Sequence, residues 1–110
     1  MVNYRLDAVA SAVASVPRRS ILERLAEGEA SMSDLADRLE VTLPAIDKHL
    51  HVLLGAGVVT KEKLGRTTVV RLVPGSLEDL ATWAMGTRLM WGNALDRLEQ
   101  HLATDTEDTP

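Results

Sequence analysis

The most informative absence in this sequence of 110 residues is cysteine, which does not occur. Without cysteine, disulfides, thiolate metal ligands, cysteine nucleophiles and thiol redox switches are excluded. Long apolar runs are also missing, so no segment is expected to span a membrane, and the first residues lack the charged-then-apolar layout of a signal peptide. These absences predict a cytoplasmic protein without a membrane partner.

Basic residues are in the minority. Lysine and arginine number 12 against 16 aspartates and glutamates, which gives a formal net charge of −4. As a whole, this balance argues against a nucleic-acid partner. The charge is unevenly distributed, however, because residues 74–110 carry a net charge of −5 and residues 41–73 a net charge of +3. The asymmetry is compatible with an ordinary solvated surface and equally with an anion-binding surface in the middle of the chain.

Four helices are predicted in the first half, because apolar residues recur at helical spacing behind residues that cap helices well. The expected segments are 6–15, 18–26, a short helix capped by Ser31 or Ser33, and a helix 43–54 capped by Thr42. Only the short turn Glu40-Val41 separates the last two, which is typical of a helix-turn-helix.

The period of the pattern changes after residue 57. Segments 58–64 and 67–73 are rich in valine and threonine and flank the tight connection Gly65-Arg66, so they predict a β-hairpin. Ser76 is expected to cap a long last helix. The fold class is therefore mainly α with a β-hairpin, a winged helix-turn-helix, with one domain over residues 1–103 and a disordered acidic tail over 104–110.

The helix 43–54 has two different faces. Ile46, Leu50 and Leu53 share the face expected in the core, whereas the opposite face carries small or polar residues. That second set consists of Pro44, Asp47, Lys48, His51 and Gly55. Such a face fits a DNA major groove, although an ordinary amphipathic surface helix would look similar. The neighbouring short helix, turn and hairpin favour the DNA interpretation.

Basic residues also surround the tip of the hairpin. Lys61, Lys63, Arg66 and Arg71 are well placed to contact phosphates, which supply affinity with little sequence information. Edge-strand lysines can instead serve to prevent aggregation, and this alternative applies to Lys61 and Lys63. Arg66, beside the tight turn, is the better candidate for DNA contact.

The stretch from Pro17 to Leu72 resembles the ArsR-type family of bacterial winged-helix transcription factors. The resemblance is carried by Pro17-Arg18-Arg19-Ser20-Ile21-Leu22, Leu25, Ser33-Asp34-Leu35-Ala36, Leu39, Thr42, Pro44-Ala45-Ile46, His49-Leu50, Leu53, Ala56-Gly57-Val58-Val59 and Gly65-Arg66. It implies a homodimer that binds a palindromic operator in double-stranded DNA, usually as a repressor. We predict no cofactor, and the sequence does not specify a small-molecule or metal effector.

The residues predicted to contact DNA lie in the helix-turn-helix, in the wing 58–73 and at the start of the helix 18–26. They are Arg18, Arg19, Ser31, Ser33, Thr42, Leu43, Pro44, Asp47, Lys48, His51, Lys63, Arg66 and Thr67. Leu43 and Asp47 depart from the family, which often has polar groups such as Gln, Arg or Ser there. Asp47 is either a specificity element, accepting from cytosine N4, or a carboxylate that pairs with Lys48 or His51 and orients it.

The last helix carries apolar residues on more faces than one core requires, so a second subunit is expected to cover it. The predicted dimer interface comprises Val9, Val13, Leu80, Trp83, Ala84, Leu89, Trp91, Leu95 and Leu98. The alternative is that Trp83 and Trp91 fill the core of the monomer. A two-fold dimer would place two recognition helices about one DNA turn apart, matching a palindromic site.

Metal binding and catalysis find little support. His49 and His51 point about 200° apart on a helix and cannot share one ion, and Asp47 with His51 supplies only two ligands. Asp96, Glu99 and His101 would need ligands from a second subunit. With no nucleophile turn or phosphate loop, the chain is not expected to be an enzyme.

A second hypothesis is a protein-interaction module that keeps the winged-helix fold but has lost DNA binding. Asp47 and the acidic C-terminal segment favour it. The first hypothesis, a DNA-binding regulator, implies a cytoplasmic location in association with the nucleoid.

Overall fold

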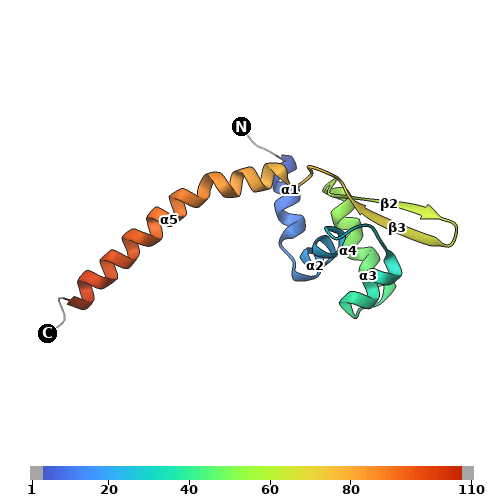
Figure 1. Cartoon of the computed structure of the whole chain (residues 1–110), viewed down its shortest axis with the longest axis horizontal. Coiled ribbons are helices and arrows are strands. Elements are labelled where there is room, and N and C mark those ends of the chain that lie inside the picture. The colour runs from blue at the N-terminus through green and yellow to red at the C-terminus, as the bar shows by residue number, and fades with distance from the viewer. Residues whose placement is uncertain (1–3, 108–110) are drawn as a thin grey trace. The chain divides into compact units, whose positions relative to one another are not determined.

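The computed structural model describes residues 4–107, except for the side chains of residues 88–95 and 103–107. The chain forms two compact units, Met1–Glu78 and Asp79–Pro110, which are described separately. The elements are α1 (Tyr4–Val13), α2 (Val16–Leu25), β1 (Ala30–Ser31), α3 (Met32–Leu39), α4 (Leu43–Gly55), β2 (Val59–Leu64), β3 (Thr67–Leu72) and α5 (Glu78–Glu107) (Figure 1). This order confirms the predicted winged helix-turn-helix.

The core of the first unit lies where the helices meet the hairpin. α2 contacts α3, α4 and β3, while α1 contacts α2 and α4. Large side chains from α2, α3, α4, β3 and the residue before β2 are fully buried, namely Ile21, Leu35, Ile46, Leu50, Leu53, Val58 and Val70. Because three of them come from α4, the face of α4 that points inward is fixed by the core, and its opposite face is turned outward.

Short polar side chains determine where the helices begin. The hydroxyls of Ser15, Ser31 and Thr42 accept hydrogen bonds from backbone N–H groups in the first turns of α2, α3 and α4. Each cap satisfies a donor that the helix cannot satisfy itself. α3 ends at Glu40, which adopts a left-handed conformation with φ of 56° and reverses the chain toward α4.

The sheet has three antiparallel strands in the order β1-β3-β2. β2 and β3 pair from Val59 with Leu72 to Leu64 with Thr67, and the turn uses Gly65 with φ of 64°. β1 was not predicted, because two residues are too short to show an alternating pattern. It pairs Ala30 with Val70 and joins the start of α3 to the wing.

The second unit consists of α5, which differs from the prediction at both ends. Ser76 does not serve as its cap: the hydroxyl is buried, 3.5 Å from the carbonyl oxygen of Val58, and the helix begins at Glu78. At the other end the helix includes residues 104–107, which were expected to belong to the disordered tail. No glycine or proline interrupts the chain between Gly92 and Pro110, so helix propagation is not stopped there. None of the described helices has the length and hydropathy needed to cross a membrane.

Candidate nucleic-acid interface

The outward face of α4 carries the residues that the helical pattern placed there. Pro44, Asp47, Lys48 and His51 are exposed, while Ile46 on the opposite face is fully buried. α3 packs against α4 across the turn at Glu40. The polar face of α4 is therefore presented on a rigid support, which a helix that enters a groove requires.

A groove of about 320 Å³ lies where the start of α3, the start of α4 and the tip of the wing meet. It is lined by Ser31, Met32, Ser33, Leu43, Arg66, Thr67 and Thr68. Five of these seven residues were predicted to contact DNA from the sequence. Met32 and Thr68 were not predicted to contact DNA. The pairing of β1 with β3 brings the start of α3 beside the strand that follows the wing turn, and this pairing was not predicted from the sequence.

Two hydroxyls at this surface are partly engaged by the backbone. Ser31 Oγ accepts from the backbone nitrogen of Asp34 at 3.0 Å, and Thr42 Oγ1 accepts from that of Ala45 at 3.3 Å. A hydroxyl that accepts one hydrogen bond keeps its own proton to donate. Both groups can thus cap a helix and donate to a phosphate oxygen at the same time.

The net positive charge of residues 41–73 comes from a small set of unpaired cations. Two of the five basic residues are neutralised locally, since Lys61 pairs with Asp47 and Arg71 pairs with Glu62. Within the described part of the chain, Lys48, Lys63 and Arg66 form no ion pair and are exposed. These three cations account for the net charge of +3 and lie on α4 and the wing.

Asp47 has a partner that the sequence did not indicate. Its Oδ1 lies 3.6 Å from Lys61 Nζ on β2, whereas Lys48 and His51 were the expected partners. Helical spacing shows only neighbours within α4, and the packing of α4 against β2 supplies the closer cation. The ion pair joins the recognition helix to the wing.

Arg71 has a structural task. Its guanidinium donates to Glu29 Oε2 at 2.5 Å and to Glu62 Oε2 at 2.8 Å. These hydrogen bonds, first that to Glu62 and then that to Glu29, raise the pKa of Arg71 above its ordinary value. The side chain therefore links the loop before β1 to the wing and stays charged at every physiological pH.

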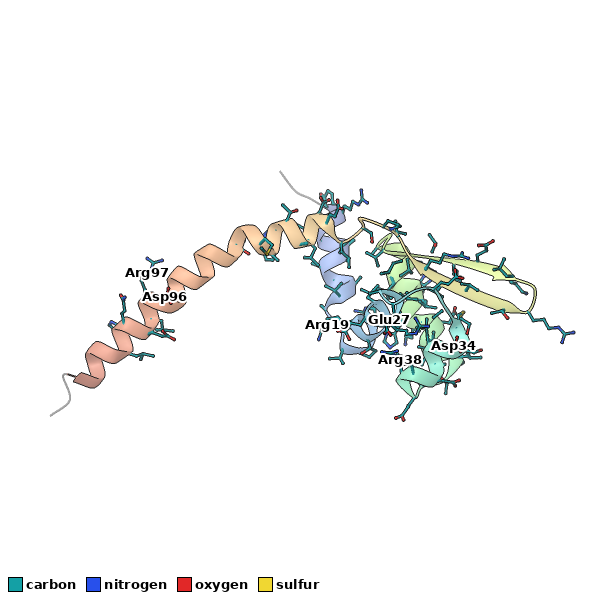
Figure 2. The ribbon with its side chains drawn as sticks, in the orientation of Figure 1. Arg19, Glu27, Asp34, Arg38, Asp96 and Arg97 are labelled. Carbon is teal, nitrogen blue, oxygen red and sulfur yellow. The ribbon has the colours of Figure 1, made fainter. Side chains whose placement is uncertain are left out.

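Arg18 and Arg19 were predicted to contact phosphates, and the structure gives both a different task. Arg18 donates from Nε to the carbonyl oxygen of Ala12 at 2.6 Å and from Nη2 to that of Ser11 at 3.2 Å. Arg19 donates from Nη1 to the carbonyl oxygen of Val13 at 2.7 Å (Figure 2). The sharp reversal between α1 and α2 brings these guanidiniums to the carbonyl end of α1, where cations are favourable.

Arg38 is also occupied, although it lies on α3. Its Nη2 is 3.2 Å from Glu27 Oε2, and both residues are labelled in Figure 2. This ion pair joins α3 to the loop that follows α2. Arg38 is therefore not a free cation, and α3 contributes to the candidate interface through the residues at its N-terminal end.

The predicted dimer residues fall into three groups. Val9 is buried in the single chain at 3% exposure, so it is a core residue rather than an interface residue, and Val13 is half-buried. On α5, Leu80 is half-buried and Trp83, Ala84 and Leu98 are exposed. The side chains of Leu89, Trp91 and Leu95 lie outside the described residues.

Trp83 is 54% exposed on α5. Met85, at 61% exposure, adds a large apolar side chain to the same helix that the predicted interface had left out. Among the described residues, no three histidine, aspartate or glutamate side chains come together in a way that could hold a metal ion.

Comparison with known proteins gives consistent matches. The family described as "Bacterial regulatory protein, arsR family" matches residues 16–61. The chain is 36% identical over 110 residues to the HTH-type transcriptional regulator Rv2034 of Mycobacterium tuberculosis, with 99% of this chain and 100% of that protein covered. It is 28% identical over 80 residues to the transcriptional repressor SdpR of Bacillus subtilis, covering 73% of this chain and 89% of that protein.

A solved structure supports the same relationship. The ArsR-like transcriptional regulator from Rhodococcus sp. RHA1 is 32% identical to this chain and matches its fold with a TM-score of 0.67. The match covers 88% of this chain and 92% of that structure.

Proposed function

The chain belongs to the ArsR family of bacterial regulatory proteins, and we propose that it acts as a homodimeric repressor that binds a palindromic operator through α4 and the β2–β3 wing. The observation that carries the proposal is that Lys48 on α4 and Lys63 and Arg66 on the wing are exposed and form no ion pair within the described part of the chain, and that Arg66 lines the groove at the start of α3 and α4. Cations in that arrangement suit the phosphates on both sides of a major groove.

Each predicted contact other than Arg18 and Arg19 has a role in this proposal. Lys48, Lys63 and Arg66 neutralise phosphates, while Ser31, Ser33, Thr42 and Thr67 donate hydroxyl hydrogen bonds to the DNA backbone. Leu43, Pro44, Asp47 and His51 face the base edges. Leu43 is 48% exposed and is a candidate for contact with a thymine methyl group. Arg18 and Arg19 are left out of the DNA contacts because they cap α1.

The homodimer is supported by α5. A helix that exposes Trp83, Met85 and Leu98 requires a cover, and a second copy of the same helix provides one. We infer that residues 1–103 carry both DNA binding and dimerisation, that the protein acts at the nucleoid in the cytoplasm, and that it has no catalytic activity.

The experiment is an electrophoretic mobility shift with the DNA upstream of the protein's own gene, followed by footprinting. We expect one complex with two protected half-sites whose centres are about one helical turn apart. Scrambled DNA of the same length should bind more weakly by several orders of magnitude. Equal affinity for both DNAs would contradict an operator-binding repressor, and binding to neither DNA would favour a protein-interaction module.

A further inference from the structure

A carboxylate on the DNA-facing side of a recognition helix needs a physical justification. Asp47 lies one helical turn beyond Leu43, and its side chain is 61% exposed. Phosphates on both sides of the groove repel an uncompensated carboxylate. The inference below rests on the proposed function, because it assigns a task to Asp47 within a DNA-bound α4.

The structure supplies the compensation through Lys61. Lys61 Nζ lies 3.6 Å from Asp47 Oδ1, and the side chain of Lys61 is 42% exposed. The lysine backbone is held in the ladder opposite Val70, which is fully buried. The ion pair therefore has no net charge at the DNA surface, and the cation comes from a strand that is fixed in place.

The ion pair leaves part of the carboxylate available. The contact with Lys61 uses Oδ1, and an ionised carboxylate has about four acceptor positions on its two oxygens. Asp47 can therefore accept from a base edge while it remains paired with Lys61. A carboxylate accepts hydrogen bonds only, so its choice of base follows from the donors in the major groove.

The four bases differ in what they present there. Guanine presents two acceptors, and thymine presents an acceptor and a methyl group. Adenine presents a donor next to an acceptor, whereas cytosine presents its N4 amino donor without an adjacent acceptor of its own. The acceptor-only side chain is therefore best matched by cytosine.

We propose that Asp47 is a specificity-determining residue that accepts a hydrogen bond from the N4 amino group of a cytosine in each operator half-site, with Lys61 as its positioning residue. This decides between the two roles that the sequence left open for Asp47. The ion pair on the wing replaces the expected pairing with Lys48 or His51.

The test measures binding of the full-length protein to a panel of operators in which every half-site position carries each of the four bases. We expect Asp47→Ala to abolish a preference for cytosine of roughly tenfold at one position in each half-site, with the other positions unchanged. Asp47→Asn should move the preference at that position from cytosine to adenine, because a carboxamide both donates to N7 and accepts from N6.

Lys61→Met serves as the matched variant for the positioning role. It should weaken binding to all operators and reduce the preference for cytosine without changing the preferred base, since Asp47 remains but loses the partner that positions it and compensates its charge. Thermal melting followed by circular dichroism checks that the variants fold, which the exposed positions of Asp47 and Lys61 lead us to expect.

Two outcomes distinguish a failure of this inference from a failure of the proposed function. If Asp47→Ala changes the affinity for all bases at every position by the same factor, Asp47 has no reading role and the inference is overturned, while the proposed function stands. If the unmodified protein binds no operator in a sequence-dependent manner, the proposed function and this inference are both overturned.

Discussion

The arginines show how one residue type takes on different tasks in a small domain. Arg18 and Arg19 cap the carbonyl end of α1, and Arg71 bridges Glu29 and Glu62, whereas Arg66 is exposed at the wing turn and forms no ion pair within the described part of the chain. Counting basic residues therefore overstates the charge available for DNA. The geometry of each guanidinium decides whether it stabilises the fold or can contact phosphate.

The first prediction concerns the half-buried Arg18. Replacing it with alanine (Arg18→Ala) removes two hydrogen bonds to carbonyl groups at the end of α1, so we expect the free energy of unfolding to fall by about 1–2 kcal/mol. Chemical denaturation measures the change. Arg5→Ala, which removes the same charge from an exposed position on α1, is the control and should change stability by less than about 0.5 kcal/mol. Unchanged stability together with weaker DNA binding would instead support the phosphate contact that the sequence predicted.

At the scale of elements, the wing reaches the groove because β1 and the Gly65 turn hold it there. β1 fixes β3 beside the start of α3, and the left-handed Gly65 makes the two-residue turn possible. Arg66 is thereby placed in the same groove as Ser33 and Leu43. The wing and the recognition helix form one continuous surface.

The second prediction tests the wing. Arg66→Ala should weaken operator binding. In a plot of log affinity against log salt concentration, the magnitude of the slope should fall by roughly 2, which corresponds to about one phosphate contact per subunit of the dimer. Fluorescence anisotropy at several salt concentrations measures the slope. Arg5→Ala should leave it unchanged. A loss of affinity for one base sequence only, with the slope preserved, would show that Arg66 reads a base instead.

Apart from β1 and the C-terminal end of α5, the elements were predictable from the sequence to within about two residues because their signals are local. Ser31 and Thr42 cap the helices that directly follow them, and Gly65-Arg66 marks the hairpin turn. Contacts between distant residues were not predictable in the same way. The partner of Asp47 and the task of Arg18 depend on how α4 packs against β2 and how the chain turns after α1, which neither spacing nor composition shows.

At the scale of the whole molecule, α5 is a long helix that leaves several large apolar side chains exposed. Trp83, Met85, Leu98 and Leu102 are each more than half exposed. Such a helix is stable in water only when another surface covers it, which accords with the proposed homodimer. The formal net charge of −4 is also a property of the whole chain, and the acidic excess lies outside the part that carries the candidate DNA interface.

The third prediction tests the dimer. Trp83→Glu places a charge where an apolar interface is proposed, so we expect a monomer at micromolar concentration and a large loss of operator affinity. Analytical ultracentrifugation gives the mass. Val16→Glu is the matched control, because Val16 is 67% exposed and lies on α2, away from α5 in the sequence. A dimer in both variants would show that Trp83 is not in the interface.

The most direct test of the central claim, that this acidic protein binds DNA through a few unpaired cations, is the salt dependence of operator binding by the unmodified protein. Two copies each of Lys48, Lys63 and Arg66 would release about six counterions, so log affinity should fall with log salt with a slope of about −5. A slope near zero, or no binding at low salt, would contradict the account.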